Sequence, residues 1–173
     1  MAVSNHLWEN VRKYVRIGNR VSELYHGERD DILRGLAEIV SENGIVYGVD
    51  QLNPFAQNKN MQELQSLSNI RLLKATLPSL PAEVSDLDGV LIREFIWTYP
   101  LPCNGSENPQ TYQAINAALH VGGHLILPLN PVEQTAERGG HPMYQHTIRR
   151  QLPHFQKVYD REDLMVYQKT NSS

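Results

Sequence analysis

Residues 20–50 read RVSELYHGERDDILRGLAEIVSENGIVYGVD, and this stretch predicts a strand, a tight turn, a helix and a second strand. The first strand is expected over 21–24. The second, over 45–49, is β-branched and uncharged, as is typical of a strand buried on both faces of a sheet. Asp50 closes it. A unit of this kind is typical of parallel sheets, which bind ligands at the carboxyl ends of their strands.

The helix between these strands is predicted from its periodicity. Its apolar positions recur at helical spacing and form one buried stripe, made of Ile32, Leu36, Ile39 and Val40. Asp30 and Asp31 fall in the first turn, where a carboxylate suits the helix dipole. Asn43-Gly44 is expected to stop the helix.

The rest of the chain continues the alternation of helices and strands. We expect a helix from Asn5 to about Val15 with Leu7 and Val11 inside, and a helix that begins at Asn53-Pro54 with Phe55, Met61, Leu64 and Leu67 inside. Two further helices are expected over 109–119 and about 143–152, and a loop over 98–108. Strands are expected at 70–73, 89–92 and 124–128 and near 155–159 and 164–169. This order favours an open, mostly parallel sheet covered on both faces. The last two strands have no helix between them and are expected to form an antiparallel hairpin at its edge.

Composition sets the broad class. The chain has 173 residues, a net charge of -3 and 40% hydrophobic residues, which suits one soluble domain and provides no electrostatic argument for nucleic acid or membrane. Cys103 is the single cysteine, so no intramolecular disulfide and no cysteine-based metal cluster can form. The sequence has no apolar signal core and no apolar run long enough for a membrane span. We therefore expect a cytoplasmic protein.

Four features in this order resemble a known family. They are the first strand and turn over Val21 to Gly27, the segment GIVYGVD ending at Asp50, the strand DLDGVLI over Asp86 to Ile92, and LHVGGHLILP over Leu119 to Pro128. With these features the chain resembles a class I, S-adenosylmethionine-dependent methyltransferase over essentially its whole length. The most specific of the four features is the last one, in which a helix ends in an apolar residue and is followed by two glycines and then an apolar strand.

The resemblance implies a Rossmann-like three-layer α/β/α sandwich. Its seven-stranded sheet would be mostly parallel with a C-terminal antiparallel hairpin. The whole of residues 1–173 would form a single methyltransferase-like domain, with an N-terminal helix within 1–18 and the core over 20–170. The resemblance also implies S-adenosylmethionine as the cofactor.

The turn after the first strand departs from the family pattern. The family has an acidic residue followed by alternating glycines, because the backbone must turn tightly and approach the cofactor closely. Glu23 stands at the acidic position and Gly27 at the second glycine, but Tyr25 and Arg29 occupy the first and third. Either the turn is a modified cofactor site, or it is a degenerate turn kept for its geometry. On the first interpretation the resemblance places His26, Gly27 and Glu28 around the methionine end of the cofactor. It also implies that Glu23 and Tyr25 belong to the cofactor-binding residues.

Asp50 provides the second half of the predicted site. A carboxylate at the tip of the second strand can accept hydrogen bonds from both ribose hydroxyls, although an aspartate at a strand end is also a common turn or cap residue. The resemblance implies Asp50, Gln51 and Leu52 around the ribose and adenine. Thr76 stands near the third strand, where the family often has a glycine and an acidic residue, and Arg93 follows the fourth strand.

Two classes of function remain open at this stage. The favoured one is a methyltransferase-like protein whose catalytic base and methyl acceptor, small molecule or macromolecule, are unknown. The alternative is a non-catalytic homologue that acts as an interaction or scaffold module, with a protein partner or a second copy of the chain. No metal site is expected, because His141 and His146 are five residues apart and fall on different faces of a helix.

Overall fold

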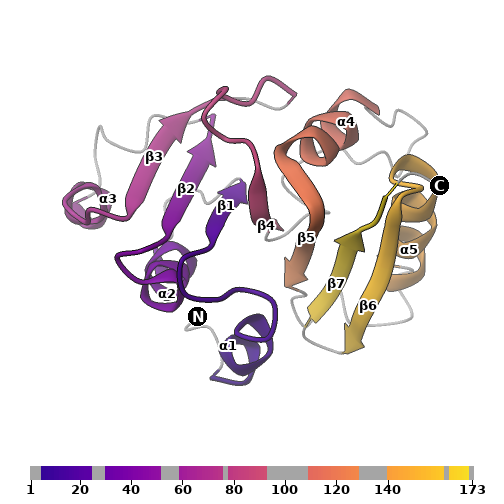
Figure 1. The fold of residues 1–173 in the computed structure, drawn as a ribbon, viewed down its shortest axis with the longest axis horizontal. Helices are drawn as coiled ribbons and strands as arrows, with labels where there is room; N and C mark the ends of the chain where they lie inside the picture. The colour runs from indigo at the N-terminus through magenta and orange to yellow at the C-terminus, as the bar shows by residue number, and fades with distance from the viewer. Residues whose placement is uncertain are drawn as a thin grey trace.

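One twisted sheet, flanked by helices, organises the chain (Figure 1). The computed structural model describes residues 5–24, 30–51, 59–75, 78–92, 109–128, 140–161 and 164–171. In chain order the elements are α1 (Asn5–Val11), β1 (Arg20–Leu24), α2 (Asp31–Val40), β2 (Ile45–Asp50), α3 (Lys59–Gln65), β3 (Ile70–Lys74), β4 (Leu87–Ile92), α4 (Pro109–Ala118), β5 (Leu119–Pro128), α5 (Gly140–Gln151), β6 (Phe155–Arg161) and β7 (Leu164–Lys169).

The seven strands lie in the order β3-β2-β1-β4-β5-β7-β6. β1 pairs in parallel with β2 and with β4, and the parallel ladder continues to β3 on one side and β5 on the other. β7 is antiparallel to both β5 and β6. The predicted mostly parallel sheet with a terminal antiparallel hairpin is therefore confirmed. Strand order reverses between β1 and β4, which makes that boundary the switch point of the sheet.

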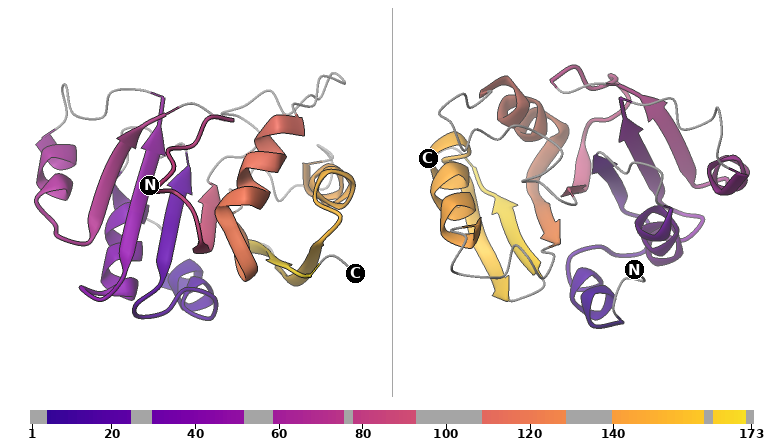
Figure 2. Two further views of the ribbon diagram at one scale, coloured as in Figure 1. Left: turned by 45° about the horizontal axis from the view of Figure 1, so that its top comes forward. Right: turned by 180° about the vertical axis from the view of Figure 1, so that it is seen from behind.

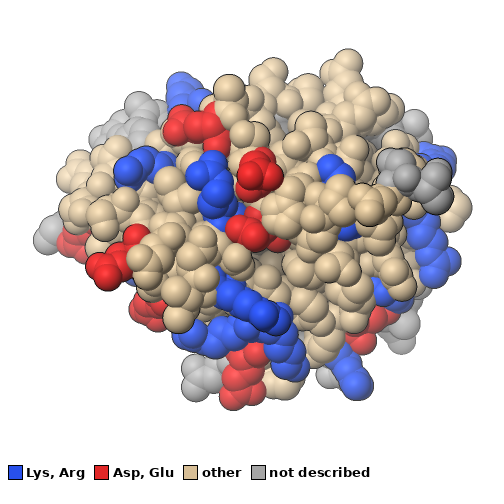
Figure 3. Space-filling view, in the orientation of Figure 1, with Lys and Arg blue, Asp and Glu red and all other residues tan. Residues whose placement is uncertain are grey.

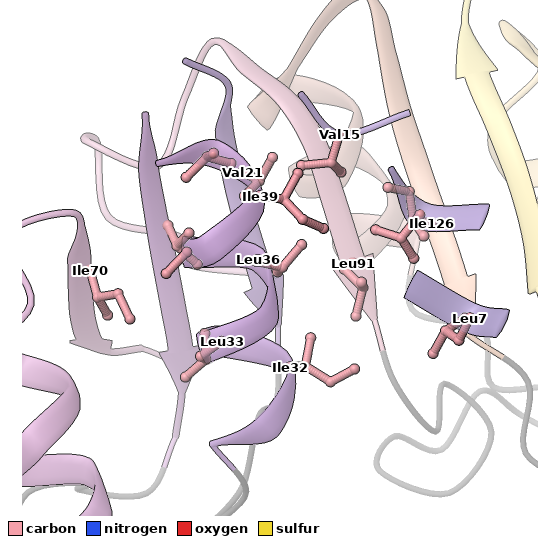
Figure 4. Packing of buried hydrophobic residues seen from close by; sticks show 14 of the residues in the cluster. Leu7, Val15, Val21, Ile32, Leu33, Leu36, Ile39, Ile70, Leu91 and Ile126 are labelled. Carbon is pink, nitrogen blue, oxygen red and sulfur yellow. The ribbon is translucent and has the colours of Figure 1, made fainter. Parts of the chain in front are cut away.

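Two hydrophobic clusters cover the two faces of the sheet. One lies between the sheet and helices α1, α2 and α3, and the other lies beneath α4 and α5. Figure 2 shows the helices on both sides of the strands, and in Figure 4 Leu36 and Ile39 of α2 lie beside Val21 and Leu91 of the sheet. The predicted stripe of α2 is confirmed, with Leu33 added. The architecture is the expected three-layer sandwich.

Three boundary predictions were wrong for local reasons. Leu67 was expected inside a helix, but α3 ends at Gln65 and the Leu67 side chain is exposed. The fifth strand begins at Leu119 rather than His124, because the double glycine lies within the strand as an irregularity instead of before it. α1 ends at Val11, although Leu7, Val11 and Val15 are all buried as predicted. The predicted helix start at 53–54 lies outside the described residues.

The end of α2 also differs from the prediction. The helix stops at Val40, and Ser41 caps it with a positive φ of 58° while its N–H donates to the carbonyl of Ala37. Gly44 is not among the described glycines with positive φ. Its role is spatial, since a Cβ at Gly44 would lie 2.5 Å from the carbonyl oxygen of Asn19 and 2.6 Å from the Cβ of Val40.

The connection from β3 to β4 is non-helical over its described residues 78–86. Arg20, the first residue of β1, reaches beneath this connection. Its Nη2 donates to the Tyr47 hydroxyl at 3.0 Å and to the carbonyls of Glu83 and Ser85 at 3.3 and 3.4 Å. The guanidinium also lies 5.5 Å from the Tyr47 ring centroid. Arg20 thereby ties the connection to the face of the sheet.

Replacing Arg20 with methionine is expected to lower the free energy of unfolding by about 1 kcal/mol, because the apolar stem stays while the hydrogen bonds and the cation–π contact are lost. Urea denaturation measures the change. Arg20→Lys is the matched control for charge, and it should recover only part of the loss because an ammonium lacks the planar fork. Equal stability of the methionine variant and the wild type would show that the connection does not depend on this contact.

Candidate functional site

Three parallel strands bring their carboxyl ends to one edge of the sheet at the switch point. Leu24, the last residue of β1, pairs with Val49 of β2 on one side and with Ile92 of β4 on the other. The strands therefore end nearly level. Open α/β sheets bind ligands outside the carboxyl ends of their strands at such a point, so this edge is the candidate site.

Glu23 is a fully buried carboxyl group just inside this edge. Its register partners are Gly48 on β2 and Leu91 on β4. Because side chains alternate along a strand, Glu23 lies on the same face as Val21, toward α2. Gly48 carries no side chain there because a Cβ would meet Leu72 at 2.7 Å and Leu33 at 3.1 Å. The predicted acidic position is thus a buried polar group beneath the edge.

Asp50 ends β2 one residue beyond the last β1–β2 pair and is only 4% exposed. Its carbonyl accepts a hydrogen bond of 2.9 Å from the N–H of Ala75, which holds the strand end against the chain leaving β3. Gln51 follows and is exposed. Asp50 is therefore a buried acidic residue at the edge where open α/β sheets bind ligands.

The structure brings together Glu23, Asp50 and Gln51 of the predicted site. The remaining predicted residues lie outside the described part of the chain: Tyr25, His26, Gly27, Glu28, Leu52, Thr76 and Arg93. They stay predictions. The described chain stops at Leu24 after β1 and at Gln51 after β2.

A second polar cluster, at the opposite edge of the sheet, was missed by the sequence analysis. The Oδ2 of Asp88 accepts a 2.7 Å hydrogen bond from the backbone N–H of Arg20, and its Oδ1 lies 3.1 Å from the Nε2 of His120. His124 belongs to the same cluster, since the charges of Asp88 and His120 shift its pKa. The available signal was an aspartate inside an apolar strand and two histidines flanking the glycine pair.

The two histidines of this cluster have opposite pKa shifts. A hydrogen bond to the Val121 carbonyl raises the pKa of His120; partial burial opposes this, and the hydrogen bond and charge of Asp88 add to it. Burial lowers the pKa of His124, and the charge of His120 lowers it further. His120 therefore favours the charged form and His124 the neutral form.

Surface charge points to no extended binding face on the side of the molecule shown in Figure 3, where acidic and basic side chains are interspersed. Among the described residues, no helix has the length and apolar character needed to cross a bilayer. The described residues also contain no group of three or more His, Cys, Asp or Glu side chains placed to hold a metal ion.

The fold is that of the class I S-adenosylmethionine-dependent methyltransferases, as the resemblance implied. Neither a protein-family model nor a curated protein sequence matches the chain. Among solved structures, a SAM-dependent methyltransferase from Aquifex aeolicus is 16% identical with a TM-score of 0.67, over 93% of this chain and 88% of its own.

Two further structures are similar at comparable levels. A chain from the complex between the Haloferax volcanii Trm112 methyltransferase activator and a methyltransferase is 15% identical with a TM-score of 0.68, over 96% of this chain and 90% of its own. An rRNA methylase from Clostridium thermocellum is 17% identical with a TM-score of 0.60, over all of both chains. At such identities the likeness establishes the fold.

Proposed function

We propose that this protein binds S-adenosylmethionine at the carboxyl edge of β1 and β2 and transfers its methyl group to an acceptor. The observation that carries the proposal is the buried carboxyl group of Asp50 at the tip of β2, beside the switch point. The similar structures described as S-adenosylmethionine-dependent enzymes support the same ligand.

The polar groups at the edge suit this cofactor. A carboxylate accepts hydrogen bonds only, and the ribose of S-adenosylmethionine offers two hydroxyl donors to Asp50. Glu23 lies buried beneath the same edge and would add a second acidic group for a cationic ligand. We assign Tyr25, His26, Gly27 and Glu28 to the methionine end of the cofactor. We assign Asp50, Gln51, Leu52 and Thr76 to the ribose and adenine.

The cofactor would supply a methyl group activated by a sulfonium, which reacts by in-line displacement. Such a reaction needs proximity and alignment above all, and a base only for some acceptors. The protein's own contribution is therefore to fix the ribose through Asp50, to keep water from the edge, and to present the acceptor beyond β4, where Arg93 begins the next segment. No single catalytic residue is required by this chemistry.

Proteins of this fold differ in acceptor and in partners. The similar structures include an O-methyltransferase from Thermotoga maritima and the rRNA methylase, so the fold does not select an acceptor class. The Haloferax volcanii chain occurs with an activator protein. A partner protein that completes an open edge is compatible with our proposal and would be sought after cofactor binding is measured.

The alternative is a non-catalytic homologue that serves as an interaction module. It is favoured by Tyr25 and Arg29, whose bulky side chains occupy positions where the family has glycine. It predicts that the purified protein binds neither S-adenosylmethionine nor S-adenosylhomocysteine.

Calorimetric titration with both ligands separates these two functions. We expect dissociation constants near the micromolar range, about 8 kcal/mol of binding free energy. Ligand at about 100 times its dissociation constant should then stabilise the folded state by about 2.7 kcal/mol. The absence of both heat and thermal stabilisation at millimolar ligand would refute the proposal in favour of the interaction module.

A further inference from the structure

The start of β5 is held to the sheet mainly by side chains. Leu87 pairs with Leu119 and Gly89 pairs with His124, so residues 120–123 stand opposite Asp88 alone. The ladder between β5 and β7 starts at His124. Residues 120–123 therefore form a bulge that the strand ladders on either side do not fasten.

His120 makes one contact within the bulge and one that fastens the bulge to β4. Nδ1 lies 2.6 Å from the carbonyl oxygen of Val121, and Nε2 lies 3.1 Å from the Oδ1 of Asp88. A carbonyl and a carboxylate only accept hydrogen bonds, and a neutral imidazole has only one N–H. Both contacts are hydrogen bonds only when the ring carries two protons. Protonation of the second ring nitrogen therefore strengthens the arrangement.

Asp88 connects this ring to a third strand. Its second carboxylate oxygen accepts from the backbone N–H of Arg20 at the start of β1. His120, Asp88 and Arg20 thus join the first residues of β5, β4 and β1 at the amino edge of the sheet.

We propose that His120 is a pH-sensitive latch that fastens the bulge at 120–123 to β4 and, through Asp88, to β1, and that the latch weakens as the pH rises. Loss of a ring proton removes the positive charge that attracts the Asp88 carboxylate, and it leaves one N–H for two acceptors, Asp88 and the Val121 carbonyl that orients the ring. The direction of the His120 pKa shift agrees, since the Val121 carbonyl and Asp88 both favour the charged ring.

Two carboxylates near the latch favour the charged ring, and the neighbouring basic groups lie on β5, on β7 and before β1. Asp86 precedes β4 and Asp88 lies on it, and both carboxylates raise the pKa of His120. His124 on β5 has a lowered pKa and lies near Arg16, and its ring packs 5.3 Å from that of Tyr14. Lys169 on β7 donates to the carbonyl of Leu119 at 2.7 Å, and burial lowers its pKa.

The glycine pair gives the bulge its hinge. Gly122 has a positive φ of 90°, and a Cβ at Gly123 would lie 2.8 Å from the carbonyl oxygen of Leu87. When the latch weakens, Gln168 still donates to the Gly122 carbonyl within the bulge and Lys169 to the carbonyl of Leu119 just before it. Release is therefore local, and the sheet stays folded.

Nitrogen NMR of the histidine side chains tests the latch in the full chain. We expect His120 to titrate above the ordinary value of about 6.5. Hydrogen exchange of the amides in 120–123 should rise, beyond the intrinsic base-catalysed increase, as His120 titrates. An ordinary pKa, or hydrogen exchange that does not follow the titration of His120, would overturn the proposal without any variant.

Three variants sharpen the test. Asp88→Asn should lower the His120 pKa toward its ordinary value. His120→Gln should remove the contribution of the latch to the pH dependence of Tm. His146→Gln, the same change at an exposed position on α5, is the control and should show the pH dependence of the wild type.

The direction of this effect follows from linkage. A raised folded-state pKa contributes stability below the unfolded pKa and loses it as pH rises through the folded pKa. Between about pH 5.5 and about pH 8.5, the Tm of the wild type should therefore fall by about 2 °C more than the Tm of the His120→Gln variant. Identical pH profiles of the two proteins would refute the latch.

Discussion

Replacing Asp50 with asparagine is expected to weaken binding of S-adenosylmethionine by at least about 100-fold. Each hydrogen bond to a charged group contributes about 1.5–3 kcal/mol, and a ribose offers two donors to this carboxylate. Asparagine keeps one uncharged acceptor oxygen, and its NH2 group faces the other hydroxyl as a donor, so one bond is lost and the other is weakened. The sum of the two losses reaches the 2.8 kcal/mol or so that corresponds to a hundredfold change. Calorimetric titration of the variant against the wild type measures the difference. The expectation rests on the proposed function.

The matched control is Asp86→Asn, the same chemical change at an exposed aspartate before β4 at the opposite edge of the sheet. Asp86 has a φ of 52°, which asparagine tolerates. Its affinity should equal that of the wild type. Circular dichroism and urea denaturation would establish that both variants are folded. A folded Asp50→Asn protein with wild-type affinity would remove Asp50 from the site, whatever the ligand does elsewhere.

Replacing Gly44 with alanine is expected to lower the free energy of unfolding by about 3 kcal/mol, at the upper end of what overpacking costs. The added Cβ would lie 2.5 Å from the carbonyl oxygen of Asn19, which accepts the hydrogen bond of Ile45 at the start of β2, and 2.6 Å from Val40 at the end of α2. Neither neighbour is the end of a flexible side chain. Strand and helix must therefore move apart.

Gly89→Ala is the control, because its Cβ would lie no closer than 3.4 Å to any neighbour, at Val21. That variant should be about as stable as the wild type. Urea denaturation of both proteins provides the comparison, and the Gly44 variant should also melt at least about 6 °C lower. Equal stability of the two variants would show that the turn between α2 and β2 relaxes at no cost.

The local sequence pattern predicted the structure correctly where a residue's environment depends on its neighbours in sequence. The buried stripe of α2 followed from helical spacing, and the burial of β2 followed from its run of apolar residues. The C-terminal hairpin followed from two strands with no helix between them. The predicted burial of Leu67 was wrong because Leu67 lies just past the end of α3, where helical periodicity no longer applies. Tertiary packing decides whether such a side chain is buried.

The candidate site divides in the same way. Asp50 was predictable, because the end of a buried strand in a parallel sheet falls at the edge where ligands bind. Glu23 could be named from its position in the chain, but its complete burial between Gly48 and Leu91 depends on the register of three strands. Register is a property of pairing between distant segments, which composition and periodicity do not encode.

The sequence by itself determined the α/β class, the alternation of elements and the acidic residue at the tip of the second strand, because each depends on short-range spacing and side-chain chemistry. Only the tertiary structure decided that Arg20 lies under the β3–β4 connection and that Asp88 meets His120 across 32 positions in the chain. Contacts between segments so far apart form only when the strands pair in their final order, and they then raise the pKa of His120 through the Val121 carbonyl and Asp88.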